Sequence, residues 1–111
     1  MGRLIYGARG MHIEVEDRLL AHLQAVVISK VRRNEGFVLS WTESSAEGSG
    51  RRSIWIHPYL ELVFEYRGSK RPEIDAKMAD EMMGRAGTNA GLDLAENAHN
   101  PKSASKVTPV S

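Results

Sequence analysis

The stretch Ser53-Ile-Trp-Ile-His-Pro-Tyr-Leu-Glu-Leu-Val-Phe-Glu-Tyr-Arg-Gly68 decides the fold class. It is the part of the chain richest in β-branched and aromatic residues and is bounded by glycines, a composition typical of strands. Apolar and mainly polar positions alternate along Leu60–Arg67, which predicts a strand of a sheet that is buried on one face. Pro58 cannot donate a ladder hydrogen bond, so we expect a turn there that splits the stretch into two antiparallel strands.

The length of this turn decides which face of the sheet carries Trp55. A two-residue turn at Pro58 and Tyr59 would put Trp55 beside Leu62, whereas one additional residue would reverse its direction. Both directions stay open from the sequence. We expect His57, next to the proline, to hydrogen-bond the backbone of the turn.

Upstream of this stretch, two strands and a helix are predicted. The runs Arg3–Tyr6 and Met11–Glu16 flank two glycines and indicate a β-hairpin. Asp17 fits the N-cap of an amphipathic helix that turns His22 toward its polar side. The core-facing positions of this helix repeat at helical spacing and are Leu20, Leu23, Val27 and Val31. Cations crowd its last turn, and Asn34 and Gly36 supply the stop.

The remaining elements follow from composition and turn signals. Phe37–Glu43 is expected to be a strand, and Ser44–Arg52 is expected to be a loop. Pro72 suits the first position of a second helix that ends near Gly84 or Gly87. A short strand at Ala90–Leu94 would complete the fold.

We therefore predict an α+β two-layer sandwich. Its mainly antiparallel sheet has five or six strands and carries two helices on one face, in the order β-β-α-β-β-β-α-(β). Residues 1–94 form a single domain, and residues 95–111 form a disordered tail because they lack aromatic residues and periodicity.

The composition is that of a soluble globular protein. Hydrophobic residues make up 41% of the 111 positions and charged residues 26%, which is ordinary for one domain with its own core. The net charge of +1 argues against bulk attraction to nucleic acid. The chain has no cysteine and no long apolar run, so we expect a cytoplasmic protein that does not insert into membranes.

Several segments resemble a family of short, uncharacterised actinobacterial proteins, some of which carry the label "ATP-dependent DNA ligase". The resemblance covers about residues 1–94 and lies in Met1–Gly7, in Glu16-Asp17-Arg18 running into Ala21-His22-Leu23, in Lys30-Val31-Arg32-Arg33-Asn34-Glu35, in Gly48-Ser49-Gly50-Arg51 and in Ile54-Trp55-Ile56-His57-Pro58. The family has no established activity, so the resemblance implies no catalytic residues.

The residues argue against catalysis of ligation. Ligases of that type form an adenylate on the lysine of a Lys-x-Asp-Gly motif. None of the lysines in this chain begins such a motif: Lys30, Lys70, Lys77, Lys102 and Lys106. The chain is also too short for a nucleotidyltransferase domain with its second domain. Metal-ligand spacing is missing among His12, His22, His57 and His99. We expect no enzyme activity, no cofactor and no metal.

Two basic segments are candidates for binding phosphate or nucleic acid. The run Gly48-Ser49-Gly50-Arg51-Arg52 combines backbone N–H groups with two guanidinium groups, which suits a phosphate, but it is more typical of a flexible hairpin loop with solvated arginines. Arg32 and Arg33 would join it in a basic face if the helix end and the loop share one edge. Otherwise they compensate the helix dipole.

Trp55, His57 and Tyr59 are the candidates for a partner surface. Two helices leave the other face of the sheet uncovered unless another chain covers it, and exposed apolar patches mark interfaces. The alternative is that the aromatic residues pack in the core. The leading functional hypothesis is a small non-enzymatic binding or assembly module that pairs with itself or another protein, and the alternative is a nucleic-acid-binding accessory protein.

Overall fold

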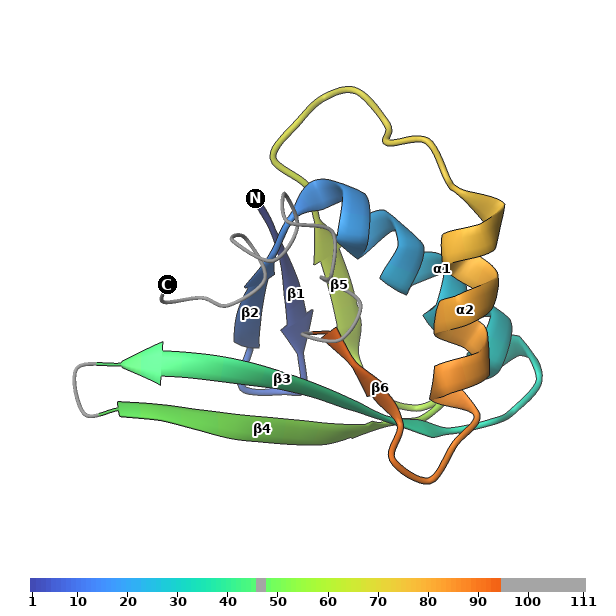
Figure 1. Ribbon diagram of the computed structural model, residues 1–111. Helices are drawn as coiled ribbons and strands as arrows, with labels where there is room; N and C mark the ends of the chain where they lie inside the picture. The colour runs from blue at the N-terminus through green and yellow to red at the C-terminus, as the bar shows by residue number, and fades with distance from the viewer. Residues whose placement is uncertain (46–47, 95–111) are drawn as a thin grey trace.

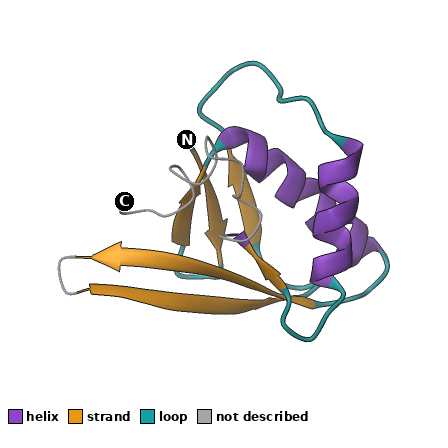
Figure 2. Ribbon diagram, in the orientation of Figure 1, coloured by secondary structure: helices purple, strands orange, loops and turns teal. Residues whose placement is uncertain are grey.

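Two three-stranded sheets and two helices make up the described part of the chain, residues 1–45 and 48–94 of a computed structural model (Figures 1 and 2). In chain order the elements are β1 Gly2–Tyr6, β2 Met11–Val15, α1 Asp17–Arg32, β3 Phe37–Ser45, β4 Gly48–Ile56, β5 Leu62–Glu65, α2 Ala76–Ala86 and β6 Leu92–Asp93. The predicted α+β class is confirmed. The predicted tail, residues 95–111, lies outside the described residues.

Each sheet has its own strand order. The first sheet runs β2-β1-β5 and is antiparallel throughout, with Leu4 opposite both Ile13 and Phe64. The second runs β4-β3-β6, with β4 antiparallel and β6 parallel to β3. Leu92 of β6 lies opposite Leu39, so the expected final strand is present.

The expectation of one five- or six-stranded sheet is wrong in its extent, because β4 and β5 lie in different sheets. The turn at Pro58 is present, and the Leu60 N–H donates to the His57 carbonyl at 3.1 Å. After this turn the chain pairs with β1, whose free edge offers Leu4 and Tyr6 opposite Phe64 and Leu62. The turn therefore carries the chain from one sheet to the other.

The region Gly48–Arg52, predicted to be part of a loop, belongs to strand β4. Strand β3 continues to Ser45, and the ladder pairs Ser45 with Gly48 and Thr42 with Arg51. The composition suggested a loop because glycine and serine are poor strand formers, but the backbone ladder of a long hairpin does not need their side chains.

Helix α1 begins and ends close to the predicted positions. Its N-cap is Glu16, which makes no side-chain cap hydrogen bond, so the expectation of Asp17 as N-cap is wrong. The predicted stop is confirmed, since Asn34 has a φ of 59° and the Glu35 N–H donates to the Lys30 carbonyl at 2.9 Å.

Helix α2 begins four residues after the predicted position. Its N-cap is Asp75, whose carboxylate accepts hydrogen bonds from the Lys77 and Met78 N–H groups at 3.0 and 3.4 Å. This cap fixes the start of the helix, so Pro72 stays in the preceding irregular segment.

One hydrophobic core lies between the helices and the two sheets. It joins residues of α1 to inward-facing residues of both sheets and of α2, including Leu4, Leu20, Leu39, Trp41 and Met82. Both helices lie together on one side of the strands (Figure 1). Among residues 1–45 and 48–94, neither helix has the length and apolar character that crossing a membrane would require.

Candidate partner surface along strand β4

Strand β4 lies at the edge of its sheet. It pairs with β3 along Gly48–Ile56, and no described strand pairs with its other side. The β3–β4 hairpin projects away from the helices, and β4 forms its outer strand (Figure 1). An edge strand presents N–H and C=O groups that can pair with another chain.

Alternate side chains of β4 point to opposite faces of the sheet. On the inner face Ile56 is fully buried and Ile54 is half-buried, opposite Phe37 and Leu39 of β3. The next position in the chain, Trp55, lies on the outer face and is 57% exposed. The inner face therefore anchors this end of the hairpin in the core.

On the outer face, Trp55 packs against Gly36. Its ring lies so close to the Gly36 backbone that a Cβ at position 36 would overlap the ring. The glycine thus acts as a platform for an aromatic residue that remains more than half exposed. This settles the direction of Trp55 that the sequence left open.

The outer face also carries a polar ladder across three strands. The Ser40 and Ser53 hydroxyl groups are 2.8 Å apart, within hydrogen-bond distance. Two residues before Ser53 on the same face, the Arg51 guanidinium donates to the Asp93 carboxylate on β6 at 2.9 Å. Arg51 is thus directed across the sheet toward β6 and away from the open edge of β4.

The turn after β4 places two more of the predicted partner residues. The His57 Nδ1 accepts a hydrogen bond from the Tyr59 N–H at 3.2 Å, so the expected role of His57 in the turn is confirmed. Tyr59 itself is 90% exposed, and its ring centroid lies 6.5 Å from that of His57. Trp55, His57 and Tyr59 therefore follow one another at the end of the strand.

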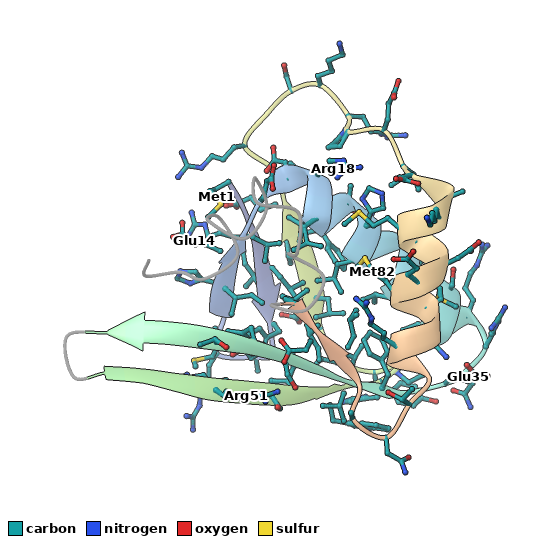
Figure 3. The ribbon with its side chains drawn as sticks, in the orientation of Figure 1. Met1, Glu14, Arg18, Glu35, Arg51 and Met82 are labelled. Carbon is teal, nitrogen blue, oxygen red and sulfur yellow. The ribbon has the colours of Figure 1, made fainter. Side chains whose placement is uncertain are left out.

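The structure does not bring the predicted basic residues together. Arg32 and Arg33 are exposed at the C-terminal end of α1, where Lys30 already pairs with Glu35 at 3.2 Å. Figure 3 shows Glu35 far from Arg51, which lies on the hairpin. Nucleic-acid binding by Arg32, Arg33, Arg51 and Arg52, with the Gly48-Ser49-Gly50 backbone, stays a prediction.

The burial of one polar side chain of α1, that of His22, was not predicted from the sequence. His22 was expected on the polar side of α1, but its side chain is fully buried. The signal was present, because His22 lies three residues after Leu19 and four before Val26, both in the core. Two hydrogen bonds satisfy its ring there, as described below.

The described residues contain no group of three or more histidine, aspartate or glutamate side chains able to hold a metal ion. What they define is a small α+β domain with an open edge strand and exposed aromatic residues beside it. The family of this domain is known by its sequence: residues 1–97 match a domain of unknown function, DUF7882, and the chain belongs to that family.

This match confirms the resemblance to an uncharacterised family, while the actinobacterial source and the ligase label remain parts of the resemblance. Neither the curated proteins nor the solved structures contain a match to this chain.

Proposed function

We propose that this protein is a non-enzymatic, cytoplasmic assembly module that pairs with a second copy of itself through strand β4. The observation that carries this proposal is the edge of a nine-residue strand, left unpaired by the strands that the structure describes, with a 57% exposed tryptophan beside it. Two antiparallel copies of β4 would form one continuous sheet, and the backbone groups of the edge would become hydrogen-bonded.

The charges of β4 favour one register of this pairing. Overlap of the whole strand would place Arg52 opposite the second copy's Arg52, and like charges opposite each other destabilise a sheet. Sliding one copy by two residues centres the pair on Ser53 and still aligns Gly50–Ile56 with itself. In this register Trp55 lies opposite the second copy's Arg51 and Arg52 lies opposite the second copy's Ile54, so no like charges face each other.

The side chains at this edge have the composition of an interface. Tryptophan and tyrosine are among the residues that most often dominate binding energy, and β4 with its following turn carries Trp55 and Tyr59. Both aromatic side chains are exposed in the single chain. Pairing across the Ser53 centre would bury a large part of Trp55.

A single introduced thiol tests this register, because the chain has no cysteine. In the Ser53→Cys variant, the thiols of two paired copies would face each other across Cα atoms about 4.5–5.5 Å apart, within the range of a disulfide. We expect mild oxidation to produce a covalent dimer. Light scattering of the unmodified chain should show a mass that rises toward the dimer with concentration.

Ser69→Cys is the matched control, because Ser69 is also exposed but lies in the segment before α2, far from β4 (Figure 1). We expect it to crosslink much more slowly. Trp55→Ala should weaken the dimer about tenfold or more if Trp55 is an interface anchor. Equal crosslinking rates of the two cysteine variants, or a monomer at every concentration, would contradict the proposal.

A further inference from the structure

The segment between β5 and α2, residues 67–75, is here called the strap; it has no helix or strand of its own and arches over α1 (Figure 1). Its first end is tied to α1 by the Asp17 carboxylate. This carboxylate accepts hydrogen bonds from the Gly68 N–H at 2.9 Å and from the Arg67 N–H at 3.3 Å. The strap is thus held where it leaves β5.

Its second end is tied by His22, five residues further along α1. The His22 Nε2 accepts a hydrogen bond from the Asp75 N–H at 2.8 Å, so Nδ1 carries the proton and donates to the Arg18 carbonyl at 2.7 Å. The Arg18 guanidinium lies 3.7 Å from the Asp75 carboxylate. A buried imidazole with both nitrogens satisfied therefore fixes the distance between the strap and the helix.

Between these two ties the strap and α1 enclose a groove of about 460 Å³. Its floor is apolar, because Ala21 and Ala25 stand one turn apart on α1 and their small side chains leave the space unfilled. Ile28 and Ile74 line it and are 44% and 50% exposed. The volume is within the range of pockets that hold small organic ligands.

The strap side of the groove is cationic. Lys70 and Arg71 both line the groove, and neither forms an ion pair with a described residue. Lys70 also borders a second hollow near Asp17 and Glu73, which Arg71 does not line, so Arg71 is the cation assigned to this groove.

Tyr66 marks the polar end of the same groove. Its hydroxyl donates a hydrogen bond to the Gln24 Oε1. Burial and the nearby Asp17 carboxylate raise the pKa of Tyr66 above its ordinary value, and the Arg71 guanidinium opposes this shift. Arg71 therefore lies close enough to act on groups at this end of the groove.

From the apolar floor and the cationic strap we infer that the groove binds a small amphipathic anion. Such a ligand has an aliphatic or aromatic body, which would cover Ile28 and Ile74, and a single carboxylate or phosphate group, which would accept hydrogen bonds from Arg71 with Lys70 nearby. The charge complementarity excludes a cationic ligand, and the apolar floor disfavours a purely ionic one.

Octanoate is a suitable probe, because it combines a carboxylate with an aliphatic chain of modest length. In a titration of the isotope-labelled full chain followed by NMR, we expect saturable shifts of the backbone amides of residues 68–71 and of Ala21, Ala25 and Ile28. Three control compounds each change one feature: octanol is uncharged, octylammonium carries the opposite charge, and acetate lacks the apolar body. Each should bind at least about tenfold more weakly, because a charge-assisted hydrogen bond or the apolar contact is lost.

Arg71→Ala should weaken octanoate binding about tenfold, while Arg33→Ala, an exposed arginine at the far end of α1, should leave it unchanged. Arg71→Lys keeps the charge and should weaken binding less than Arg71→Ala. Because the side chain of Arg71 is exposed, all three variants should keep the amide spectrum of the folded chain. Equal affinity for octanol and octanoate, unchanged binding by Arg71→Ala, or shifts centred on β4 would overturn the inference.

Discussion

Strand β4 and the strap are both surface segments, but their backbones are hydrogen-bonded in different ways. The backbone of β4 is regular, and beyond its ladder to β3 no strand of the described residues pairs with its other side. The strap is irregular, yet its two ends donate N–H groups to Asp17 and His22 of α1. Backbone N–H and C=O groups need hydrogen-bond partners, so the groups that lack a partner within the fold influence what a segment can bind. Strand β4 is suited to another strand, and the strap is suited to a small molecule beneath it.

The two regions also differ in how they are attached to the core. Strand β4 is anchored by apolar burial at Ile56, whereas the strap is anchored by the polar side chain of His22. Loss of an apolar anchor leaves a cavity, and loss of a polar anchor leaves unsatisfied groups. Substitutions at these two anchors therefore test whether the two regions are stabilised by different interactions.

We expect the largest effect from Ile56→Ala. The Ile56 side chain is fully buried, so its truncation should lower the free energy of unfolding by about 3 kcal/mol through lost burial and a cavity. The neighbouring Trp55→Ala is the matched control and should cost less than about 1 kcal/mol, because the ring is 57% exposed. Urea-induced unfolding measures both. Equal losses would mean that the outer face of the hairpin is as important for the fold as the inner one.

The next largest effect is expected from His22→Ala. This change removes a fully buried ring and leaves the Asp75 N–H without its acceptor, which together should cost about 2–3 kcal/mol of unfolding free energy. Hydrogen exchange should also quicken at Asp75 more than at residues of β4. If exchange quickened equally in the hairpin, the strap would not be a separately held region.

Substitution of Asp17 tests the hydrogen bonds at the first end of the strap, and a smaller loss of stability is expected there. Asp17→Ala removes the acceptor of two exposed N–H groups, and we expect a loss of about 1 kcal/mol because water can replace the carboxylate there. Asp17→Asn keeps an acceptor oxygen without the charge and should lose less. Groove binding of octanoate should weaken with Asp17→Ala if this tie shapes the groove, and an unchanged affinity would show that His22 alone positions the strap.

Much of the fold follows from patterns of the sequence that reflect local physics. The alternation of Leu60–Arg67, the apolar stripe of α1 and the stop at Asn34 all report periodicity or backbone conformation, and each is confirmed. The division into two sheets could not be predicted, because alternation says which side chains turn inward but not which strand lies beside which. The pairing of β5 with β1 depends on contacts between segments far apart in the chain.

The candidate sites show the same limit. The sequence singled out Trp55, His57 and Tyr59, and the structure places the two large aromatic side chains in solvent. The sequence did not indicate the groove, because the groove is formed by small residues of α1 that lie under a segment distant in the chain. Asp17 illustrates the reason: its spacing suggested a cap for its own helix, but its carboxylate accepts hydrogen bonds from residues 67 and 68. Local spacing cannot report such a partner.

The smallest expected effect concerns the ionisation of Tyr66 and tests how the strap is arranged around it. Burial, and to a lesser degree Asp17, raise the pKa of Tyr66, so the folded chain holds this proton more tightly than the unfolded chain. The associated stability is present below the ordinary tyrosine pKa and is lost as the pH rises through the folded value. Absorbance of tyrosinate, taken as the difference from Tyr66→Phe, reports the titration. Arg71→Ala should raise the pKa further because the opposing cation is gone, and Asp17→Asn should lower it. If Arg71→Ala left the titration unchanged, Arg71 would not face the groove, and the contrast between a cationic strap and an open strand edge would no longer hold.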